Sequence, residues 1–156
     1  MGSPPVVLLA IDSMPACVVG VLPQSLPNFQ GDLIRDLIAA GYAVTGMAEL
    51  AGIDEVIGIE ALGCAFKPYP VRRNRVDPVS DLITFLALFR AFRAIRPVLV
   101  VAYTIKPVIW GGLALRFVPG VRFVAQITGL GYAFQPGGRS RHLHGHSVCH
   151  LVLSGD

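Results

Sequence analysis

The chain has 156 residues, of which 53% are hydrophobic and 15% charged, and its formal net charge is +3 with a pI near 9.0. This composition excludes a disordered chain, and the length suffices for one ordinary domain with a buried core. The positive charge is mild and forms no long basic run, so we expect no nucleic-acid partner.

The high mean hydropathy of +0.61 raises the question of a membrane segment. The longest apolar stretch, residues 82–89, is interrupted by Thr84 and followed by Arg90. It is far shorter than the roughly 20 residues that a spanning helix needs. The apolar run at residues 6–11 has no basic region before it, which argues against a secretory signal. We therefore expect a cytoplasmic protein whose apolar surface contacts a partner domain or, peripherally, the inner face of the plasma membrane.

Short apolar runs typical of strands alternate along the chain with segments of helical periodicity. Gly41 and Gly63 are expected just after the ends of two helices. The strongest predicted helix has Asp77 as its N-cap and Pro78 at its first position, and Pro97 ends it. The predicted strands are residues 6–11, 17–22, 43–48, 64–69, 98–103 and 121–127, and the predicted helices are 32–40, 54–62, 78–96 and 107–117. This alternation predicts an α/β fold: a Rossmann-like, mostly parallel sheet with helices on both faces.

Ligands of such sheets bind at the carboxyl ends of the strands. Three loops of unusual sequence fall there: residues 23–31, 104–107 and 128–134. We expect Ser25, Thr104 and Thr128 to cluster at this edge. No GxGxxG follows a strand and no GxxxxGK[ST] exists, so a nicotinamide site or a P-loop has no direct support.

Three strings carry a resemblance to a known family: SLPNFQGDLIRDLIAAGY (25–42), VAYTIKPVIWGGLALRF (101–117) and FVAQITGLGYAF (123–134). In this order and spacing they resemble the N-terminal domain of family 4 glycosyltransferases, nearest to the branch that builds capsular and exopolysaccharide chains. Residues 60–82 also fit. The resemblance implies one half of a two-domain GT-B enzyme. In that family the N-terminal half receives the acceptor, often a lipid-linked sugar, and the C-terminal half binds the nucleotide sugar.

The resemblance divides the chain into an N-terminal extension (1–15), an acceptor-side domain (16–134) and an irregular tail (135–156). It implies sugar transfer with retention at the anomeric carbon, from a nucleotide-sugar co-substrate to a glycan or lipid-linked acceptor, without another cofactor. Because the donor domain would be missing, we expect the isolated chain to be inactive. The alternative is a non-catalytic acceptor- or membrane-binding module that needs a separate donor domain.

Catalytic residues are not assigned, but substrate-binding residues are. Backbone N–H groups beside a helix N-terminus could hold an anion or sugar hydroxyls. Lys106 could place a charge beside a phosphate, although a solvated loop lysine explains it as well. Glycines in the last loop would let the backbone approach the substrate. Tyr103 and Tyr132 could stack on sugar rings or pack in the core. The candidates are Ser25, Asn28, Gly31, Thr104, Lys106, Thr128, Gly129, Gly131 and Tyr132.

Cysteines and histidines suggest no further chemistry. The three cysteines form no CxxC pair, and Cys17 and Cys64 lie in apolar runs typical of core positions. In the tail, His142, His144, His146 and Cys149 are competent zinc ligands, but their spacing resembles no structural zinc motif, so we predict no metal site. A frameshift after Phe134 is an alternative explanation of the tail's composition.

Overall fold

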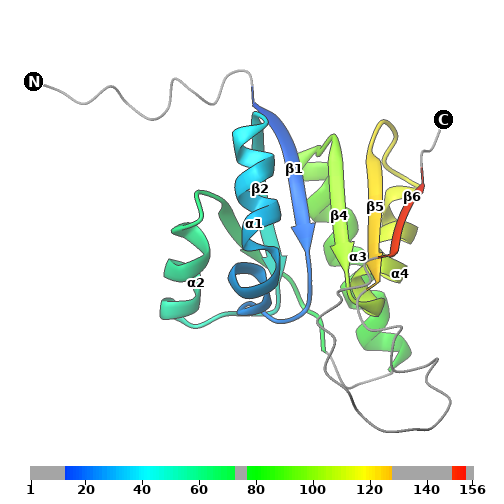
Figure 1. Cartoon of the computed structure of the whole chain (residues 1–156). Helices are drawn as coiled ribbons and strands as arrows, with labels where there is room; N and C mark the ends of the chain where they lie inside the picture. The colour runs from blue at the N-terminus through cyan, green and yellow to red at the C-terminus, as the bar shows by residue number, and fades with distance from the viewer. Residues whose placement is uncertain (1–12, 73–76, 128–148, 154–156) are drawn as a thin grey trace, which may run out of the picture.

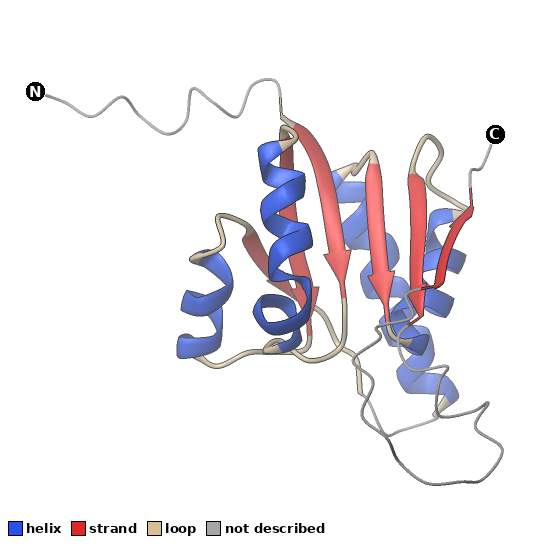
Figure 2. Ribbon diagram, viewed as in Figure 1, coloured by secondary structure: helices blue, strands red, loops and turns tan. Residues whose placement is uncertain are grey.

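A sheet with helices on both faces forms the domain (Figures 1 and 2). The structure is a computed structural model that describes residues 13–72, 77–127 and 149–153. The strands are β1 (Met14–Val19), β2 (Tyr42–Ala48), β3 (Ala65–Pro68), β4 (Leu99–Tyr103), β5 (Arg122–Ile127) and β6 (Cys149–Leu153). The helices are α1 (Ser25–Ala39), α2 (Ile53–Glu60), α3 (Pro78–Ile95) and α4 (Ile105–Leu115).

The strands are ordered β3-β2-β1-β4-β5-β6. The first five are parallel, and β6 runs antiparallel to β5. Consecutive strands up to β5 are joined through a helix, as parallel strands require, and α3 carries the chain from β3 at one edge to β4 beside β1. The predicted class, a Rossmann-like α/β fold with a mostly parallel sheet, is confirmed.

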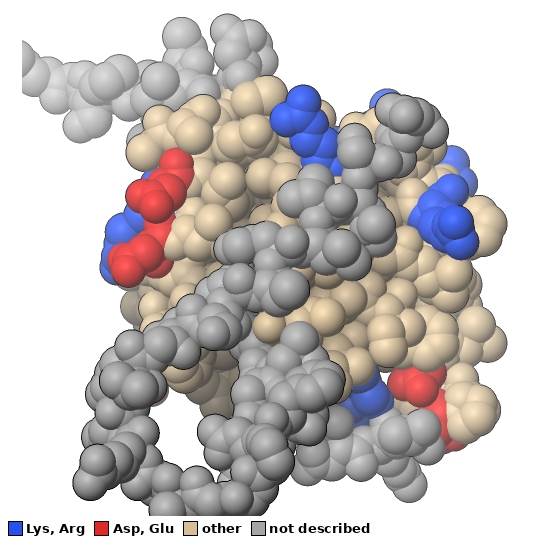
Figure 3. Space-filling view, turned by 45° about the vertical axis from the view of Figure 1, so that its right-hand side comes forward, with Lys and Arg blue, Asp and Glu red and all other residues tan. Residues whose placement is uncertain are grey.

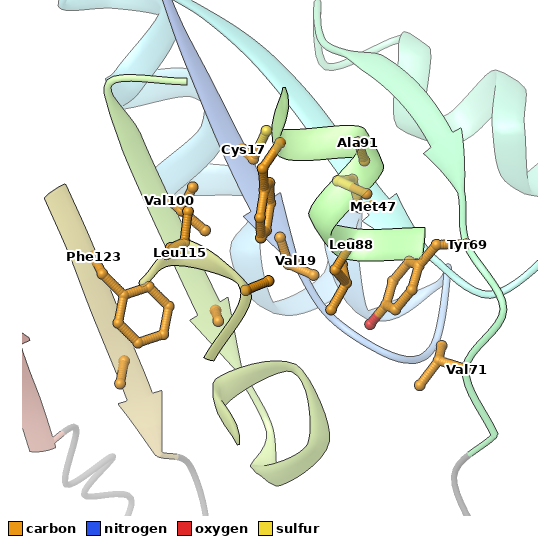
Figure 4. Close-up of a cluster of buried hydrophobic side chains, with 14 of the residues drawn as sticks. Cys17, Val19, Met47, Tyr69, Val71, Leu88, Ala91, Val100, Leu115 and Phe123 are labelled. Atoms are coloured by element: carbon orange, nitrogen blue, oxygen red, sulfur yellow. The ribbon is translucent and has the colours of Figure 1, made fainter. Parts of the chain in front are cut away.

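Two apolar layers hold the helices on the sheet. On one face, Leu88 and Phe92 of α3 and Leu115 of α4 pack with Val100 and Phe123 of the sheet (Figure 4). On the other face, α1 and α2 bury side chains that include Leu26, Ile34 and Ile59. Removing these side chains from water, at about 25 cal/mol per Å² of apolar surface, is the main force that assembles the sandwich.

The predicted helix ends are largely confirmed. The carboxylate of Asp77 accepts a hydrogen bond from the N–H of Val79 at 3.4 Å, and Pro78 occupies the first position of α3. At the far end of α3, Arg96 adopts a left-handed conformation with φ of 52°. Gly41 and Gly63, which follow α1 and α2, have φ of 94° and 90°, a region that glycine adopts without a steric penalty.

The first strand lies earlier than predicted. It spans Met14–Val19 rather than residues 17–22, so the apolar run 20–22 is not a strand. Val21 lies in the loop after β1, and its side chain is buried there, which explains an apolar residue at this position. Its carbonyl oxygen accepts a hydrogen bond from the N–H of Glu49 at 2.9 Å. The predicted strand 6–11 lies outside the described residues.

The tail also departs from the prediction. Residues 149–153 form β6, which pairs with β5 from Ile127↔Cys149 to Phe123↔Leu153, although an irregular tail was expected there. Charged side chains are sparse on the surface, and on the face drawn in Figure 3 they form small separate groups with uncharged surface between them. None of the described helices is long and apolar enough to cross a membrane.

Candidate substrate-binding edge

The carboxyl ends of β1 and β4 lie side by side, and a hydrogen-bonded chain joins the loops that follow them. The Ser25 hydroxyl donates to the carbonyl oxygen of Leu22 at 2.5 Å, and its oxygen lies 2.8 Å from the Tyr103 hydroxyl. Because the single serine proton points to Leu22, the Tyr103 hydroxyl is the donor to Ser25. Thr104 directly follows Tyr103, so the structure brings the loops of Ser25 and Thr104 together, as predicted. Thr128 lies outside the described residues.

Two tyrosines hold the β1–α1 loop from different sides. The Tyr69 hydroxyl donates to the carbonyl oxygen of Gly20 at 2.6 Å. The Tyr103 ring lies against Gly20 so closely that a β-carbon there would be 2.1 Å from its Cζ atom. Burial raises the pKa of Tyr103 to about 12. Burial also raises the pKa of Tyr69 above its usual value. Both phenols are therefore neutral donors, and Tyr103 is a core residue rather than a sugar platform.

The start of α1 differs from the prediction, and this changes the expected anion site. The helix begins at Ser25, so Asn28 and Gly31 lie within it rather than before it. The N–H groups of Ser25, Leu26 and Asn28 donate to the carbonyl oxygens of residues 22, 23 and 24 at 3.1–3.3 Å, and Pro27 has no N–H. The first turn therefore offers no unused backbone donor to an anion.

Lys106 is neither the open-cleft cation nor the solvated loop lysine of the sequence analysis. It lies in the first turn of α4, and its Nζ atom is 3.3 Å from Oδ1 of Asp81 on α3. The two side chains are only 17% and 13% exposed. This ion pair joins the starts of α3 and α4, so the Lys106 charge is largely neutralised at close range.

Thr104 is the most strained residue of this edge. Its φ of 71° and ψ of 156° fall in a region that is essentially restricted to glycine. Its Oγ1 atom is buried and has no hydrogen-bond partner among the residues that the structure describes. Strain of this kind costs on the order of 1–3 kcal/mol and clusters at functional sites. Thr104 therefore stays a substrate-binding candidate.

A hollow of about 700 Å³, open to solvent on one side, lies farther along the same edge. It is bounded by the ends of β2 and β3 and the first turns of α3, and its volume is in the range of small-molecule sites. Its polar groups come from Glu49, Arg72, Asp77 and Ser80. The remaining lining residues are Leu50, Pro68, Tyr69, Pro70, Val71, Val79 and Ile83.

The sequence analysis missed this hollow. A signal existed, because Glu49 directly follows β2 and a polar residue at the carboxyl end of a parallel strand is well placed for ligands. The position of Glu49 is fixed by the hydrogen bond from its N–H to the carbonyl oxygen of Val21 at 2.9 Å.

The other predicted chemistry is tested only in part. Candidates Thr128, Gly129, Gly131 and Tyr132 lie outside the described residues, as does the stretch from residue 142 to 148. Among the described residues no group of three metal-binding side chains occurs. Cys17 and Cys64 are buried, as predicted, and burial raises the pKa of the Cys17 thiol to about 12.

Comparison with known proteins supports the fold but selects no activity. No protein-family model matches the chain, and no curated protein matches it. A glycosyltransferase from Rickettsia africae superposes with a TM-score of 0.53 at 12% identity over 72% of this chain, and a UDP-N-acetylglucosamine 2-epimerase with 0.55 at 13% over 73%. The chain spans only 29% and 33% of their lengths. These likenesses show a Rossmann-like fold.

A different enzyme shares the fold equally well. A deacetylase of teicoplanin biosynthesis superposes with a TM-score of 0.57 at 13% identity, over 81% of this chain and 72% of the deacetylase. The backbone alone therefore does not distinguish sugar transfer from other chemistry, and only the side chains of the site can indicate an activity.

Proposed function

We propose that the chain is the acceptor-binding part of a nucleotide-sugar-dependent glycosyltransferase of the family 4 type. The observation that carries this proposal is the hollow at the carboxyl edge, bounded by β2, β3 and α3. The three sequence strings support the same assignment, and the Rossmann-like fold is compatible with it. The donor sugar would come from a nucleotide sugar, and the acceptor is a glycan or a lipid-linked sugar of polysaccharide biosynthesis.

The chemistry of the hollow suits a sugar with an attached phosphate. Carboxylates of Glu49 and Asp77 can accept hydrogen bonds from sugar hydroxyls, and such charge-assisted bonds are stronger than neutral ones. The Arg72 guanidinium offers a fork of donors to a phosphate. Val79 and Ile83 provide an apolar wall for the carbon-bound faces of a sugar or for a lipid chain.

The remaining candidates belong to the same edge. Ser25 and Thr104 lie at the carboxyl ends of β1 and β4, and Asn28 is exposed in the first turns of α1. We propose that Thr128 and Gly129 approach the acceptor from the neighbouring strand, together with Gly131 and Tyr132. In a two-domain transferase the reacting atoms meet between the halves, where positioning and a closed site lower the barrier. We therefore expect the chain alone to bind acceptor without turning over a nucleotide sugar.

Acceptor binding tests this proposal directly. Titrate the chain with a water-soluble oligosaccharide carrying a terminal pyrophosphate, and follow binding by calorimetry. Glu49→Gln should weaken binding by about tenfold, because a hydrogen bond to a charged group is worth about 1.5–3 kcal/mol. The matched control is Glu60→Gln on exposed α2, which should leave binding unchanged. Equal effects of the two substitutions, or no binding by the unmodified chain, would remove the hollow as an acceptor site.

The second candidate is a non-catalytic module that binds acceptor or membrane and works with a separate donor domain. An exposed apolar surface on α3 and α4 favours it, because such surfaces mark interaction sites. Transfer of radiolabelled sugar separates the two readings. A donor domain is added to the chain, and product formation is measured. Product that decreases with Glu49→Gln supports the enzyme. Acceptor binding without any product supports the non-catalytic module.

A further inference from the structure

Opposite charges are separated onto the two sides of the sheet. Helices α1 and α2 cover one side, and α3 and α4 cover the other (Figure 1). The sequences of α1 and α2 contain one basic residue, Arg35, which lies 2.9 Å from the Asp32 carboxylate. The sequences of α3 and α4 contain one acidic residue, Asp81, which pairs with Lys106 at 3.3 Å. The remaining helix charges therefore make the first side acidic and the second side basic.

The exposed side of α2 combines apolar and acidic side chains. Ile53 and Ile57 are about one turn apart, and their side chains are 81% and 59% exposed. Asp54 and Glu60 are also exposed, and they lie on either side of this pair around the helix. We call these four residues the α2 face. Exposed apolar side chains that are rimmed by charges are typical of protein–protein contact sites.

The exposed sides of α3 and α4 combine apolar side chains with arginines. On α3, the leucines precede the arginines at spacings of three to four residues, which place them on one side of the helix. The Arg93 guanidinium lies 5.6 Å from the centre of the Phe89 ring, an attraction that favours its place at this surface. We call this surface the α3–α4 face, and its residues are Leu82, Leu86, Arg90, Arg93, Leu113 and Arg116. The leucines are 41–56% exposed.

The two faces complement each other, whereas neither complements itself. Two α3–α4 faces would bring arginines against arginines, and two α2 faces would bring carboxylates against carboxylates. Like charges opposed across an interface are strongly unfavourable. An α2 face placed against the α3–α4 face of another copy instead brings carboxylates beside guanidinium groups and covers apolar side chains of both copies.

We propose that copies of this chain associate head to tail, with the α2 face of one copy docked on the α3–α4 face of the next. The two faces lie on opposite sides of the sheet (Figure 1), so a docked pair still presents one free face at each end. Such a contact between different surfaces is open-ended unless it closes into a ring. The association goes beyond acceptor binding and does not depend on it, because none of the residues of the two faces lines the hollow.

Sedimentation equilibrium of the unmodified full chain tests the association itself. The weight-average mass should rise with protein concentration past the mass of a dimer. It should fall back towards the monomer at about 1 M salt, where the Debye length is about 3 Å. A monomer at every concentration would overturn the proposal, and so would a mass that stops at the dimer. Association that salt leaves unchanged or strengthens would also overturn it, because complementary charges would then not hold the copies together.

Charge reversal identifies the two faces. Arg90→Glu with Arg93→Glu makes the α3–α4 face acidic, and Asp54→Arg with Glu60→Arg makes the α2 face basic. Each double variant then has like charges on both faces, so its association should weaken by about tenfold or more. Equimolar mixing of the two variants should restore association, because each interface again joins an acidic face to a basic one. If mixing does not restore association of variants that circular dichroism shows to be folded, the proposal is wrong.

The matched control keeps the sign of the charge. Arg90→Lys with Arg93→Lys should retain most of the association, because both side chains remain cationic. A loss as large as that of the glutamate variant would contradict the charge argument. If reversal on α3 changes the mass and reversal on α2 does not, copies meet through their α3–α4 faces, and the head-to-tail contact is wrong.

The same variants keep this proposal separate from the acceptor site. All of them should bind the soluble pyrophosphate oligosaccharide as tightly as the unmodified chain in calorimetry, and Glu49→Gln should leave the association unchanged. Loss of only one activity in the unmodified chain therefore removes only the corresponding proposal.

Discussion

Replacing Gly20 by alanine tests whether the two tyrosines fix the loop after β1. A β-carbon at this position would lie 2.1 Å from Cζ and 2.2 Å from the hydroxyl oxygen of Tyr103. The backbone itself poses no obstacle, because Gly20 has no left-handed φ. The whole cost must therefore come from displacing the Tyr103 ring, which is only 3% exposed and is hydrogen-bonded to Ser25.

The expected decrease in the free energy of unfolding has two parts. Overpacking a filled core costs about 1–3 kcal/mol. A displaced ring also gives up its hydrogen bond with Ser25, worth about 0.5–1.5 kcal/mol. The free energy of unfolding should fall by about 2–4 kcal/mol in total. For a chain of this size, each kcal/mol shifts Tm by about 2–4 °C, so Tm should drop by roughly 5–15 °C.

Urea unfolding followed by circular dichroism measures this difference, and a double-mutant cycle identifies its cause. In a Tyr103→Leu background the atoms that clash are absent, so Gly20→Ala should cost much less. In a Tyr103→Phe background the Cζ atom remains, and the cost should persist. Gly58→Ala is the control, because its β-carbon would meet nothing within 4 Å on exposed α2 and should stabilise the chain by about 0.5–1 kcal/mol. An equal cost of Gly20→Ala in the leucine and unmodified backgrounds would refute the reasoning.

Three other predictions concern the same edge and the core beneath it. Tyr69→Phe should lower the free energy of unfolding by about 1–3 kcal/mol in urea titrations, because the carbonyl oxygen of Gly20 loses its buried partner. Thr104→Gly should raise Tm, because it relieves strain worth about 1–3 kcal/mol and removes a buried hydroxyl that no described residue pairs with. A lower Tm would contradict the strain. Stability should fall as pH rises from 9 to 12, because Cys17 and Tyr103 ionise near pH 12 in the folded chain but at 9 and 10 when unfolded; Cys17→Ala should flatten this dependence from pH 9 upward.

Sequence reasoning succeeded where local signals decide the structure. Asp77 and Pro78 correctly predicted the start of α3, and Gly41 and Gly63 correctly predicted the ends of two helices. Helix caps and left-handed turns depend mainly on the type of residue at that position, so they can be read from the sequence. Sequence reasoning failed where contacts between distant elements decide the local structure. The run 20–22 has the hydrophobicity of a strand, yet Val21 is apolar only because other elements bury its loop.

The errors at α1 have a similar physical origin. The apolar spacing predicts a helix over residues 32–40, but α1 begins at Ser25 and includes Pro27 and Gly31, which in general disfavour a helix interior. Pro27 lies in the first turn, where its missing N–H costs nothing. Gly31 is buried against neighbouring side chains of α1 and of the turn after α2. The place of Glu49 directly after β2 was a signal, but the whole hollow could not be predicted because Glu49, Arg72 and Ser80 are separated along the chain and meet only through the order of the strands.

The packing at the carboxyl edge decides which part of it is free to recognise a ligand. The loop after β1 has its Gly20 carbonyl bonded to Tyr69, its Ser25 hydroxyl bonded to Leu22 and Tyr103, and the first amides of α1 all used within the chain. A ligand that bound there through these groups would first have to break bonds that stabilise the fold. The carboxylate of Glu49 and the guanidinium of Arg72, by contrast, line the open hollow. We therefore propose that the hollow beside α3 recognises the ligand, and that the β1–α1 loop is the rigid support that positions Glu49 through Val21.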